Sequence, residues 1–256
     1  MTDRLPHWLR FRLIADRVLA AAAGIVLSPM IAVFAVLVKR EDGGPSFITV
    51  TRVGRDGRLF KMWKLRSMRA SRPDGTADGL TLSGGHDDRI TRIGGHLRAY
   101  HFDELPQLLN VVRGEMGILG PRPETPEFVD LDDPMWQVAL SIPPGIAGPT
   151  QVIVNDWERS LIDEVPDGSA YRTKVVPVKL AIDAWYLERS SPVTDALVAI
   201  TLVRRFLPGT ESTTLKSAVF AAVPESLVVR DFIRSRKRRM AEARAEPNPE
   251  ISSIPV

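Results

Sequence analysis

The chain has 256 residues, 44% of them hydrophobic and 25% charged, which is enough for one substantial core and a small appendage. Because there is no cysteine, a disulfide framework and a thiolate metal site are both excluded. The net charge of +3 is concentrated in a C-terminal stretch, Arg230 to Arg244, that contains seven basic and two acidic residues. Such a stretch suits an anionic membrane surface, a nucleic acid or simply a solvated helix. No nucleic-acid-binding motif accompanies it, so we predict no nucleic-acid partner.

The first expected element is a membrane helix. Residues 18–38 read VLAAAAGIVLSPMIAVFAVLV, 21 residues without a charge. As a straight helix they would measure about 31 Å, enough to cross a bilayer. Ser28 and Pro29 stand at the centre of this segment. Because proline removes a backbone donor and collides with the carbonyl of Ile25, we predict a break or bend there, with the Ser28 hydroxyl satisfying freed backbone groups.

Basic residues flank this segment on both sides. They are Arg10, Arg12 and Arg17 before it, and Lys39 and Arg40 after it. Since positive charge tends to stay on the cytosolic side of a membrane, both ends belong on that face. We therefore rank a re-entrant helix first, a single transmembrane span second and a cleaved signal sequence third, because no clear small-residue cleavage site follows the apolar run.

The next segment has the pattern of a β-hairpin. Residues 46–54 (SFITVTRVG) are rich in β-branched residues, and residues 59–68 (LFKMWKLRSM) alternate apolar and basic residues. Arg55-Asp56-Gly57 between them is a turn signal, so two paired strands are expected. Residues 71–87 are rich in Gly, Ser and Asp and are expected to form a loop.

A helix is predicted after this loop. Its apolar residues recur at helical spacing, at Leu105, Leu108, Leu109 and Val112. Pro106 fits the first turn of such a helix and Gly114 fits its end. Asp103 and Glu104 then stand immediately before the helix, where the positive end of its dipole attracts phosphate.

Two amphipathic helices are expected farther along the chain. One presents a face made of Val178, Ile182, Trp185 and Arg189. The other presents a face made of Val193, Leu197, Ile200, Arg204 and Leu207. Packing against the core is the default explanation for such faces. The membrane segment upstream makes a position in the membrane interface the more specific alternative.

The adjacent carboxylates of Asp103 and Glu104 have two interpretations. Taken alone, such a pair caps a helix and matches its dipole. A site for metal and phosphate is favoured by the cations that surround the pair in sequence, at Lys64, Arg66, Arg98 and Arg122. Arg122 lies between two prolines, and a guanidinium held by a stiff backbone suits bidentate phosphate recognition. In such a site the carboxylates bind Mg²⁺, the cations neutralise a diphosphate, and one carboxylate can attack phosphorus.

The motifs, taken in order, resemble one family, the bacterial sugar transferases, which are polyprenyl-phosphate glycosyl-1-phosphate transferases with a monotopic membrane anchor. No Walker A sequence, dinucleotide fingerprint or nucleophile elbow accompanies them. The resemblance covers residues 10–207. Its motifs are the apolar helix broken at Ser28-Pro29, Gly44-Pro45, RVGRDG at 52–57, KLRSM at 64–68, DDRITRIG at 87–94, Leu97-Arg98, DELPQLLNV at 103–111, GPRP at 120–123, PGIAGPTQV at 144–152 and the helix at 179–187.

This resemblance implies a reaction. The enzyme would transfer a sugar-1-phosphate from a nucleotide diphosphate sugar, usually a UDP-sugar, to a polyprenyl phosphate and release UMP, which initiates glycan or exopolysaccharide assembly. Asp103 would attack the β-phosphorus to form a covalent phosphosugar intermediate, and Glu104 would hold the Mg²⁺ cofactor. The phosphates or the nucleotide would be bound by Lys64, Arg66, Arg98 and Arg122.

The resemblance also implies partners and a location. The nucleotide sugar, the polyprenyl phosphate and the lipids of the cytoplasmic membrane are the expected partners, and a homodimer is compatible with them. The chain is expected in the bacterial cytoplasmic (inner) membrane, with its catalytic domain on the cytosolic face.

The expected fold class is α+β, predominantly helical. It consists of a re-entrant membrane helix broken at Ser28-Pro29, a small β-hairpin and amphipathic interfacial helices around a cytosolic active site. The expected domains are an N-terminal arm with the membrane helix at 1–40, a catalytic domain at 41–207, and a C-terminal extension with a basic helix and a disordered tail at 208–256.

Two alternatives stay open at this point. A catalytically silent membrane protein would recruit glycan-assembly partners, through the basic C-terminal stretch. A nucleotidyl transferase or a phosphatase would also use carboxylates and Mg²⁺, but it would release pyrophosphate or inorganic phosphate in place of UMP.

Overall fold

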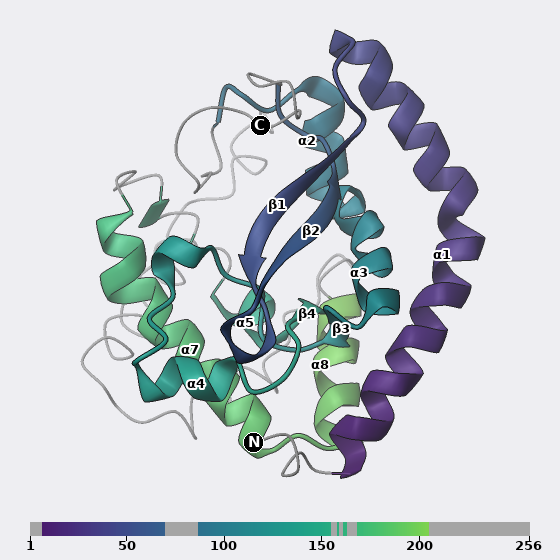
Figure 1. Ribbon diagram of the computed structural model, residues 1–256. Helices are drawn as coiled ribbons and strands as arrows, with labels where there is room; N and C mark the ends of the chain where they lie inside the picture. Colours follow the sequence, from purple (N-terminus) through teal and green to yellow (C-terminus); the bar gives the residue numbers. More distant parts are fainter. Residues whose placement is uncertain (1–6, 70–86, 155–157, 159–160, 163–167, 205–256) are drawn as a thin grey trace, which may run out of the picture.

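The computed structural model describes residues 7–69, 87–154, 158, 161–162 and 168–204. The described part is mostly helical, with two small two-stranded sheets (Figure 1). The predicted α+β class with mainly helical content is therefore confirmed. The loop expected at 71–87 lies almost entirely outside the described residues, and the extension expected at 208–256 lies wholly outside them.

The first helix, α1 (His7–Asp42), runs along one side of the molecule and bows outward (Figure 1). Pro29 lies inside the helix, and helical structure continues through it. The Ser28 hydroxyl donates a hydrogen bond of 2.8 Å to the carbonyl of Ile25, which is the carbonyl that an N–H at position 29 would otherwise bind. The role predicted for Ser28 is confirmed. The predicted break at Ser28-Pro29 is wrong, because the hydroxyl supplies the donor that proline lacks and the helix bends without interruption.

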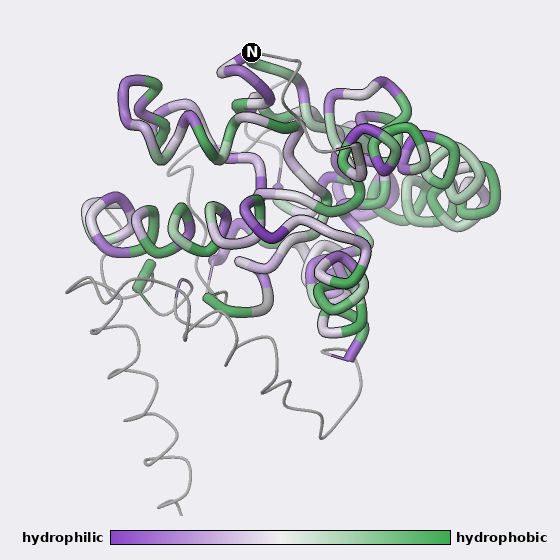
Figure 2. Tube along the Cα trace, turned by 90° about the horizontal axis from the view of Figure 1, so that it is seen from below, coloured by the Kyte–Doolittle hydropathy of each residue, from purple (hydrophilic) through white to green (hydrophobic). Residues whose placement is uncertain are grey.

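Hydrophobic residues make up most of α1 (Figure 2), and many of them are exposed. The residues that are more than half exposed are Phe11, Ile14, Val18, Leu19, Ile25, Val26 and Val33. Within the described part of the chain, α1 is the one helix that is long and apolar enough to cross a membrane. A continuous apolar face of this size is expected to be covered by lipid or by another chain.

The predicted hairpin is confirmed. Strands β1 (Phe47–Val53) and β2 (Leu59–Leu65) pair in antiparallel fashion. A 3-10 turn, Arg55–Gly57, joins them, and Asp56 within it takes the left-handed backbone conformation (φ 54°). Lys64 therefore lies near the open end of the hairpin, away from this turn.

The segment with the paired carboxylates is built from three short helices in succession. They are α2 (Arg92–Ala99), the 3-10 helix η3 (Phe102–Gln107) and α3 (Leu108–Arg113). The predicted end at Gly114 is confirmed, since this residue has the left-handed conformation (φ 78°) that terminates helices. The helix predicted from the spacing of Leu105, Leu108, Leu109 and Val112 is confirmed, but Leu109 and Val112 are each 42% exposed, while Asn110 and Val111 are buried.

The rest of the described chain forms a helical lobe around a short parallel sheet. The strands are β3 (Gly117–Leu119) and β4 (Gly145–Ala147), and the helices are η4 (Pro126–Phe128), α4 (Pro134–Ala139), α5 (Pro149–Ile153), the π-helix η5 (Tyr171–Val175), α7 (Val176–Glu188) and α8 (Pro192–Arg204). The largest hydrophobic core of the described residues is built mainly from α4, η5 and α7.

The two predicted amphipathic helices have different environments. On α7, Val178, Ile182 and Trp185 are buried in the core. This face therefore packs against the core and does not lie in a membrane interface. On α8, Val193 and Ile200 are 78% and 52% exposed. The apolar face of α8 therefore remains available for the membrane interface.

A buried ionic cluster attaches the N-terminal half of α1 to this lobe. Arg12 donates to Asp195 of α8 (3.0 Å) and to the hydroxyl of Tyr186 on α7 (2.6 Å). Asp16 accepts a hydrogen bond from the backbone of Ile118 in β3 (3.0 Å). Arg12 is thus a structural ion-pair partner, although its position beside the apolar segment suggested a membrane-surface charge.

Candidate active site

Asp103 and Glu104 lie in the first turn of η3, and each is 5% exposed. The turn follows His101, which takes the left-handed conformation (φ 58°). Neighbouring side chains on a helix do not face each other. The two adjacent carboxylates therefore meet different surroundings.

Two cations from distant parts of the chain converge on Glu104. The Nζ of Lys64, at the end of β2, lies 3.0 Å from its Oε1. The guanidinium of Arg122 donates to Oε1 at 2.6 Å and to Oε2 at 3.3 Å. The structure thus brings together three of the residues that the sequence predicted for the site.

The electrostatics of this cluster keep Glu104 ionised. Burial alone would raise the pKa of Glu104, but the charges of Arg122 and Lys64 outweigh it and hold the pKa well below its usual range. Burial alone would lower the pKa of the Arg122 guanidinium, but the negative charge of Glu104 outweighs this effect and raises the pKa. With Asp103 the cluster holds two carboxylates and two cations, so its formal charge is zero, and the two cations can bind the phosphates of an anionic substrate such as a diphosphate.

Asp103 has a different role open to it. In the described part of the chain its carboxylate makes neither a hydrogen bond nor an ion pair, although it is close enough to raise the pKa of Arg122. A carboxylate that is not neutralised by a partner keeps its nucleophilic lone pairs available. The pair therefore divides into an anchored carboxylate and an unpaired one.

Arg66 is placed elsewhere. Its buried guanidinium pairs with Asp42 at the end of α1 (2.8 Å for one of the two bonds). Gly44 makes room for it, since a Cβ at this position would lie 2.3 Å from the guanidinium. Arg66 thus ties the end of α1 to the hairpin, and this contact differs from the substrate contact that the sequence predicted.

Arg98 lies in the last turn of α2. The pKa of Asp87 is lowered first by its hydrogen bond from Arg89, and the charge of Arg98 lowers it further. The structure therefore associates Arg98 with Asp87 at the start of the segment that leads into α2.

The described residues do not form a ready-made metal site. No group of three or more His, Asp or Glu side chains among them could hold a metal ion, and Lys64 and Arg122 already bind Glu104. Mg²⁺ in phosphoryl-transfer sites uses one or two carboxylates and completes its shell with water and substrate phosphates. A single carboxylate of this site would therefore suffice for an ion that arrives with a diphosphate.

Asn110 is a structural residue of the site that the sequence did not reveal. Its side-chain oxygen accepts a hydrogen bond from the backbone N–H of Trp63 (3.0 Å), and its amide donates to the carbonyl of Lys61 (2.8 Å). The amide thus pairs with the open edge of β2 as a neighbouring strand would. This contact fixes Lys64 relative to η3 and explains why a polar residue occupies the buried face of α3.

A second missed group lies next to Arg122 along the chain. Glu124 accepts hydrogen bonds from Lys179 (2.9 Å) and Tyr171, and Lys179 also donates to Tyr171 (2.7 Å). Burial raises the pKa of Glu124, but Lys179 and the hydrogen bonds lower it to about 2. Tyr171 and Lys179 are 47 and 55 positions from Glu124, so no local spacing could have predicted the contact.

Comparison with known proteins identifies the family. The model of the family described as bacterial sugar transferase matches residues 8–208. An exopolysaccharide production protein, ExoY of Sinorhizobium fredii, is 34% identical over 195 residues, which cover 72% of this chain and 79% of that protein.

Two further relatives are longer proteins. The UDP-N-acetylgalactosamine-undecaprenyl-phosphate N-acetylgalactosaminephosphotransferase of Aeromonas hydrophila is 34% identical over 196 residues, 75% of this chain and 43% of the relative. The UDP-glucose:undecaprenyl-phosphate glucose-1-phosphate transferase of Escherichia coli is 36% identical over 146 residues, 56% of this chain and 30% of the relative. The chain thus spans less than half the length of these two relatives. Because the family model nevertheless matches from α1 through the carboxylate pair to the end of α8, this chain belongs to the bacterial sugar transferase family.

Proposed function

We propose that the protein is a phosphoglycosyl transferase that moves a sugar-1-phosphate from a UDP-sugar to a polyprenyl phosphate, such as undecaprenyl phosphate, and thereby initiates exopolysaccharide or other glycan assembly. Family membership supports this reaction class, and two of the relatives carry the names of undecaprenyl-phosphate transferases. The observation that carries the proposal is the difference between Glu104, which pairs with Lys64 and Arg122, and the adjacent Asp103, which has no hydrogen-bond or ion-pair partner among the described residues.

In the first step, a carboxylate oxygen of Asp103 attacks the β-phosphorus of the UDP-sugar. The bond between this phosphorus and the bridging oxygen breaks, and UMP leaves with the electron pair. The product on the enzyme is a mixed anhydride that joins the Asp103 carboxylate to the sugar phosphate. In the second step, a phosphate oxygen of the polyprenyl phosphate attacks the same phosphorus, which releases the lipid diphosphate sugar and restores Asp103.

Lys64 and Arg122 supply the positive charge that this transfer needs. Both point at Glu104 in the structure, and the charge of Asp103 also acts on Arg122. They would stabilise the charge that develops on the phosphoryl oxygens and on the departing UMP. Mg²⁺, held by Glu104 and the substrate diphosphate, would neutralise the same oxygens.

The two-step route suits substrates from different phases, because the soluble donor and the lipid acceptor need not be bound together. We propose that α1 enters the cytoplasmic membrane and returns to the cytosolic face, with its exposed apolar surface in the lipid. Its bow and its basic flanking residues support this topology. The exposed face of α8 would lie at the interface.

The topology has a direct test, since the chain has no native cysteine. Leu5→Cys and Pro45→Cys variants in closed membrane vesicles should react with an impermeant maleimide from the same side. Labelling from opposite sides would establish a single span and exclude the re-entrant arrangement.

The reaction itself is tested with purified protein in membranes that contain undecaprenyl phosphate. A panel of UDP-sugars that includes UDP-glucose and UDP-N-acetylgalactosamine should yield UMP with at least one member. Asp103→Asn should abolish this release, while Asp132→Asn, which changes an exposed aspartate, should leave it intact. Release of pyrophosphate or inorganic phosphate in place of UMP, or full activity of Asp103→Asn, would refute the proposal.

A further inference from the structure

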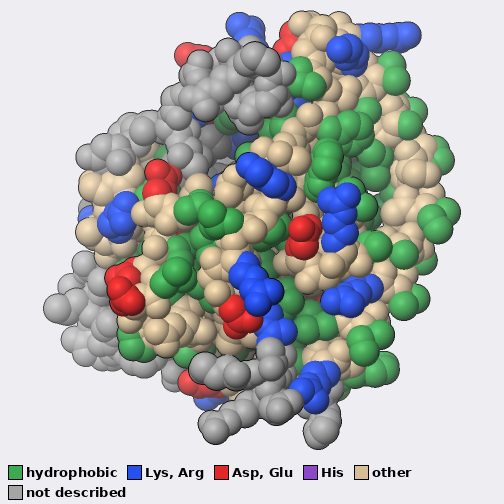
Figure 3. Space-filling view, viewed as in Figure 1, with side chains coloured by type: hydrophobic (Ala, Val, Ile, Leu, Met, Phe, Trp, Pro, Cys, Tyr) green, Lys and Arg blue, Asp and Glu red, His purple; other side chains and the backbone are tan. Residues whose placement is uncertain are grey.

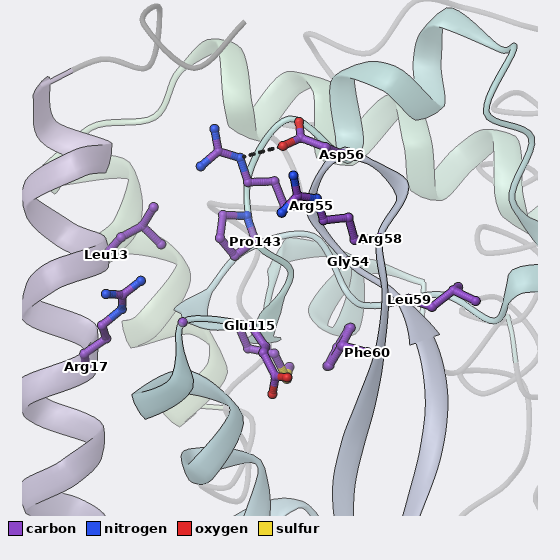
Figure 4. Close-up of a pocket in the computed structure, with 12 residues that line it drawn as sticks. Leu13, Arg17, Gly54, Arg55, Asp56, Arg58, Leu59, Phe60, Glu115 and Pro143 are labelled. Atoms are coloured by element: carbon purple, nitrogen blue, oxygen red, sulfur yellow. Dashed lines mark ion pairs between the residues drawn. The ribbon is translucent and has the colours of Figure 1, made fainter.

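A second site lies beside the hairpin turn, at the opposite end of the hairpin from Lys64. An open cavity of about 470 Å³ lies between the N-terminal half of α1, the turn Arg55–Gly57 and the loop after α3 (Figure 4). This volume is typical of a small-molecule site. It is lined by neither of the carboxylates of the catalytic pair nor by Lys64 or Arg122.

Three arginines line this cavity, two from the hairpin turn and its end and one from α1: Arg55, Arg58 and Arg17. Arg55 pairs with Asp56 at 3.4 Å, and the acidic Glu115 accepts a hydrogen bond from Asn110 at 2.7 Å. In the described ranges the side chains of Arg17 and Arg58 make no ion pair or hydrogen bond. The ionisable residues of the lining are three arginines, Asp56 and Glu115, so its formal charge is +1, and Arg17 and Arg58 can contact one anionic group between them.

The backbone fixes the position of Arg17. Its guanidinium lies over Gly114, where a Cβ would come within 2.2 Å of a guanidinium nitrogen. Gly114 also has the left-handed φ of 78° that glycine tolerates best. The residue that ends α3 thus leaves the space through which Arg17 reaches the cavity.

The cavity borders the apolar face of α1. Ile14 and Val18, three residues before and one residue after Arg17, are 65% and 67% exposed. Figure 3 shows basic side chains on the face beside α1 and apolar side chains along its outer margin. A ligand between Arg17 and Arg58 would thus have its anionic group in the cavity and any acyl chains beside α1.

We propose that this cavity binds the phosphate of an anionic phospholipid headgroup and so fixes the depth of α1 at the membrane surface. Guanidinium groups suit a lipid phosphate because they form charge-assisted hydrogen bonds to its oxygens. The inference relies on the membrane position proposed for α1, but not on the transfer reaction. Binding is measured without a nucleotide sugar, so the two proposals fail separately.

The test uses the full chain in a neutral detergent and follows its thermal unfolding. Short-chain phosphatidylglycerol is titrated in one arm, short-chain phosphatidylcholine in a second and inorganic phosphate in a third. Phosphatidylglycerol alone should raise the Tm of the wild type in a saturable manner. In Arg17→Gln/Arg58→Gln the lipid concentration for half of the effect should rise about tenfold or more, since two charge-assisted contacts are lost.

The matched control is Arg92→Gln/Arg189→Gln, which removes two exposed arginines away from the cavity and should keep the wild-type response. If the double variant does not fold, the single variant Arg58→Gln, which changes an exposed residue, replaces it. This variant should also weaken the rise of Tm with phosphatidylglycerol. An equal response to inorganic phosphate would refute the lipid assignment. A wild type that does not respond to phosphatidylglycerol, or variants that respond like the wild type, would refute the site.

Discussion

Lys64 and Glu104 lie 40 residues apart in the sequence, and their side chains meet with Nζ 3.0 Å from Oε1. The side chain of Glu104 is 6% exposed and that of Lys64 is 19% exposed. Coulomb attraction between such shielded groups is much stronger than at an open surface. The contact therefore joins the hairpin to η3 and at the same time shapes the charge around the carboxylate pair.

Glu104→Gln should reduce UMP release by about two orders of magnitude or more, because Lys64 and Arg122 lose the charge that orients them. The variant should also be less stable, since removing one member of a buried ion pair leaves the others uncompensated at a cost of about 3–5 kcal/mol. Both effects are measured, as kcat/KM for the UDP-sugar and as the urea midpoint. Glu127→Gln, which changes an exposed glutamate, is the control and should behave like the wild type. A Glu104→Gln enzyme that keeps the wild-type kcat/KM would contradict the role assigned to Glu104.

Asn110→Leu tests whether the link between α3 and β2 positions Lys64. The substitution keeps an apolar volume in the buried site but leaves the N–H of Trp63 and the carbonyl of Lys61 without their side-chain partner. Each unsatisfied buried group costs about 1–3 kcal/mol, so the free energy of unfolding should fall by a few kcal/mol. KM for the UDP-sugar should rise as Lys64 moves. Leu109→Asn, on the exposed face of the same helix, should change stability little.

These residues show how far the sequence predicts the structure. Local signals were sufficient for the hairpin, where β-branched residues flank a turn, and for the end of α3, where Gly114 supplies the left-handed conformation. The order of motifs was sufficient for the family. The buried face of α3 and the pairing of Arg66 with Asp42 were not predictable, because both depend on hydrogen bonds between segments that are distant in sequence.

Gln107 lies one helical turn after Asp103 and is 1% exposed, and neither polar atom of its side chain has a hydrogen-bond partner among the described residues. Burial of such an amide is costly, so a function that needs it is expected. Gln107→Leu should therefore raise the Tm or leave it unchanged, while UMP release falls at least tenfold. Gln107→Glu should be less stable than the wild type, because a charge then replaces the amide in a buried position. If Gln107→Leu keeps full activity, the amide has no part in the reaction.

Asp183 provides a test based on pH. It is buried on α7, and its Oδ1 has no hydrogen-bond partner within the described ranges. Burial, assisted by the charge of Glu124 and opposed by that of Lys179, raises the pKa of Asp183 to about 8. In the unfolded chain an aspartate has a pKa near 3.9.

Between about pH 4 and pH 8 the folded protein holds a proton on Asp183 that the unfolded chain has released. The contribution of this group to stability is therefore fully present below about pH 4, is lost as the pH rises toward 8, and is constant above that value. The amide in the variant Asp183→Asn cannot ionise, so this dependence should disappear from the variant. It should unfold at nearly the same urea concentration as the wild type at pH 4 and at a higher one at pH 7, with a difference in unfolding free energy of a few kcal/mol.

Urea unfolding in neutral detergent at several values between pH 4 and pH 8.5 measures this difference. Asp132→Asn changes an exposed carboxylate and should follow the wild type at every pH. Parallel curves for Asp183→Asn and the wild type would mean that Asp183 is ionised in the folded protein across the whole range. In that case the positive charge of Lys179 would outweigh both burial and the negative charge of Glu124 at Asp183.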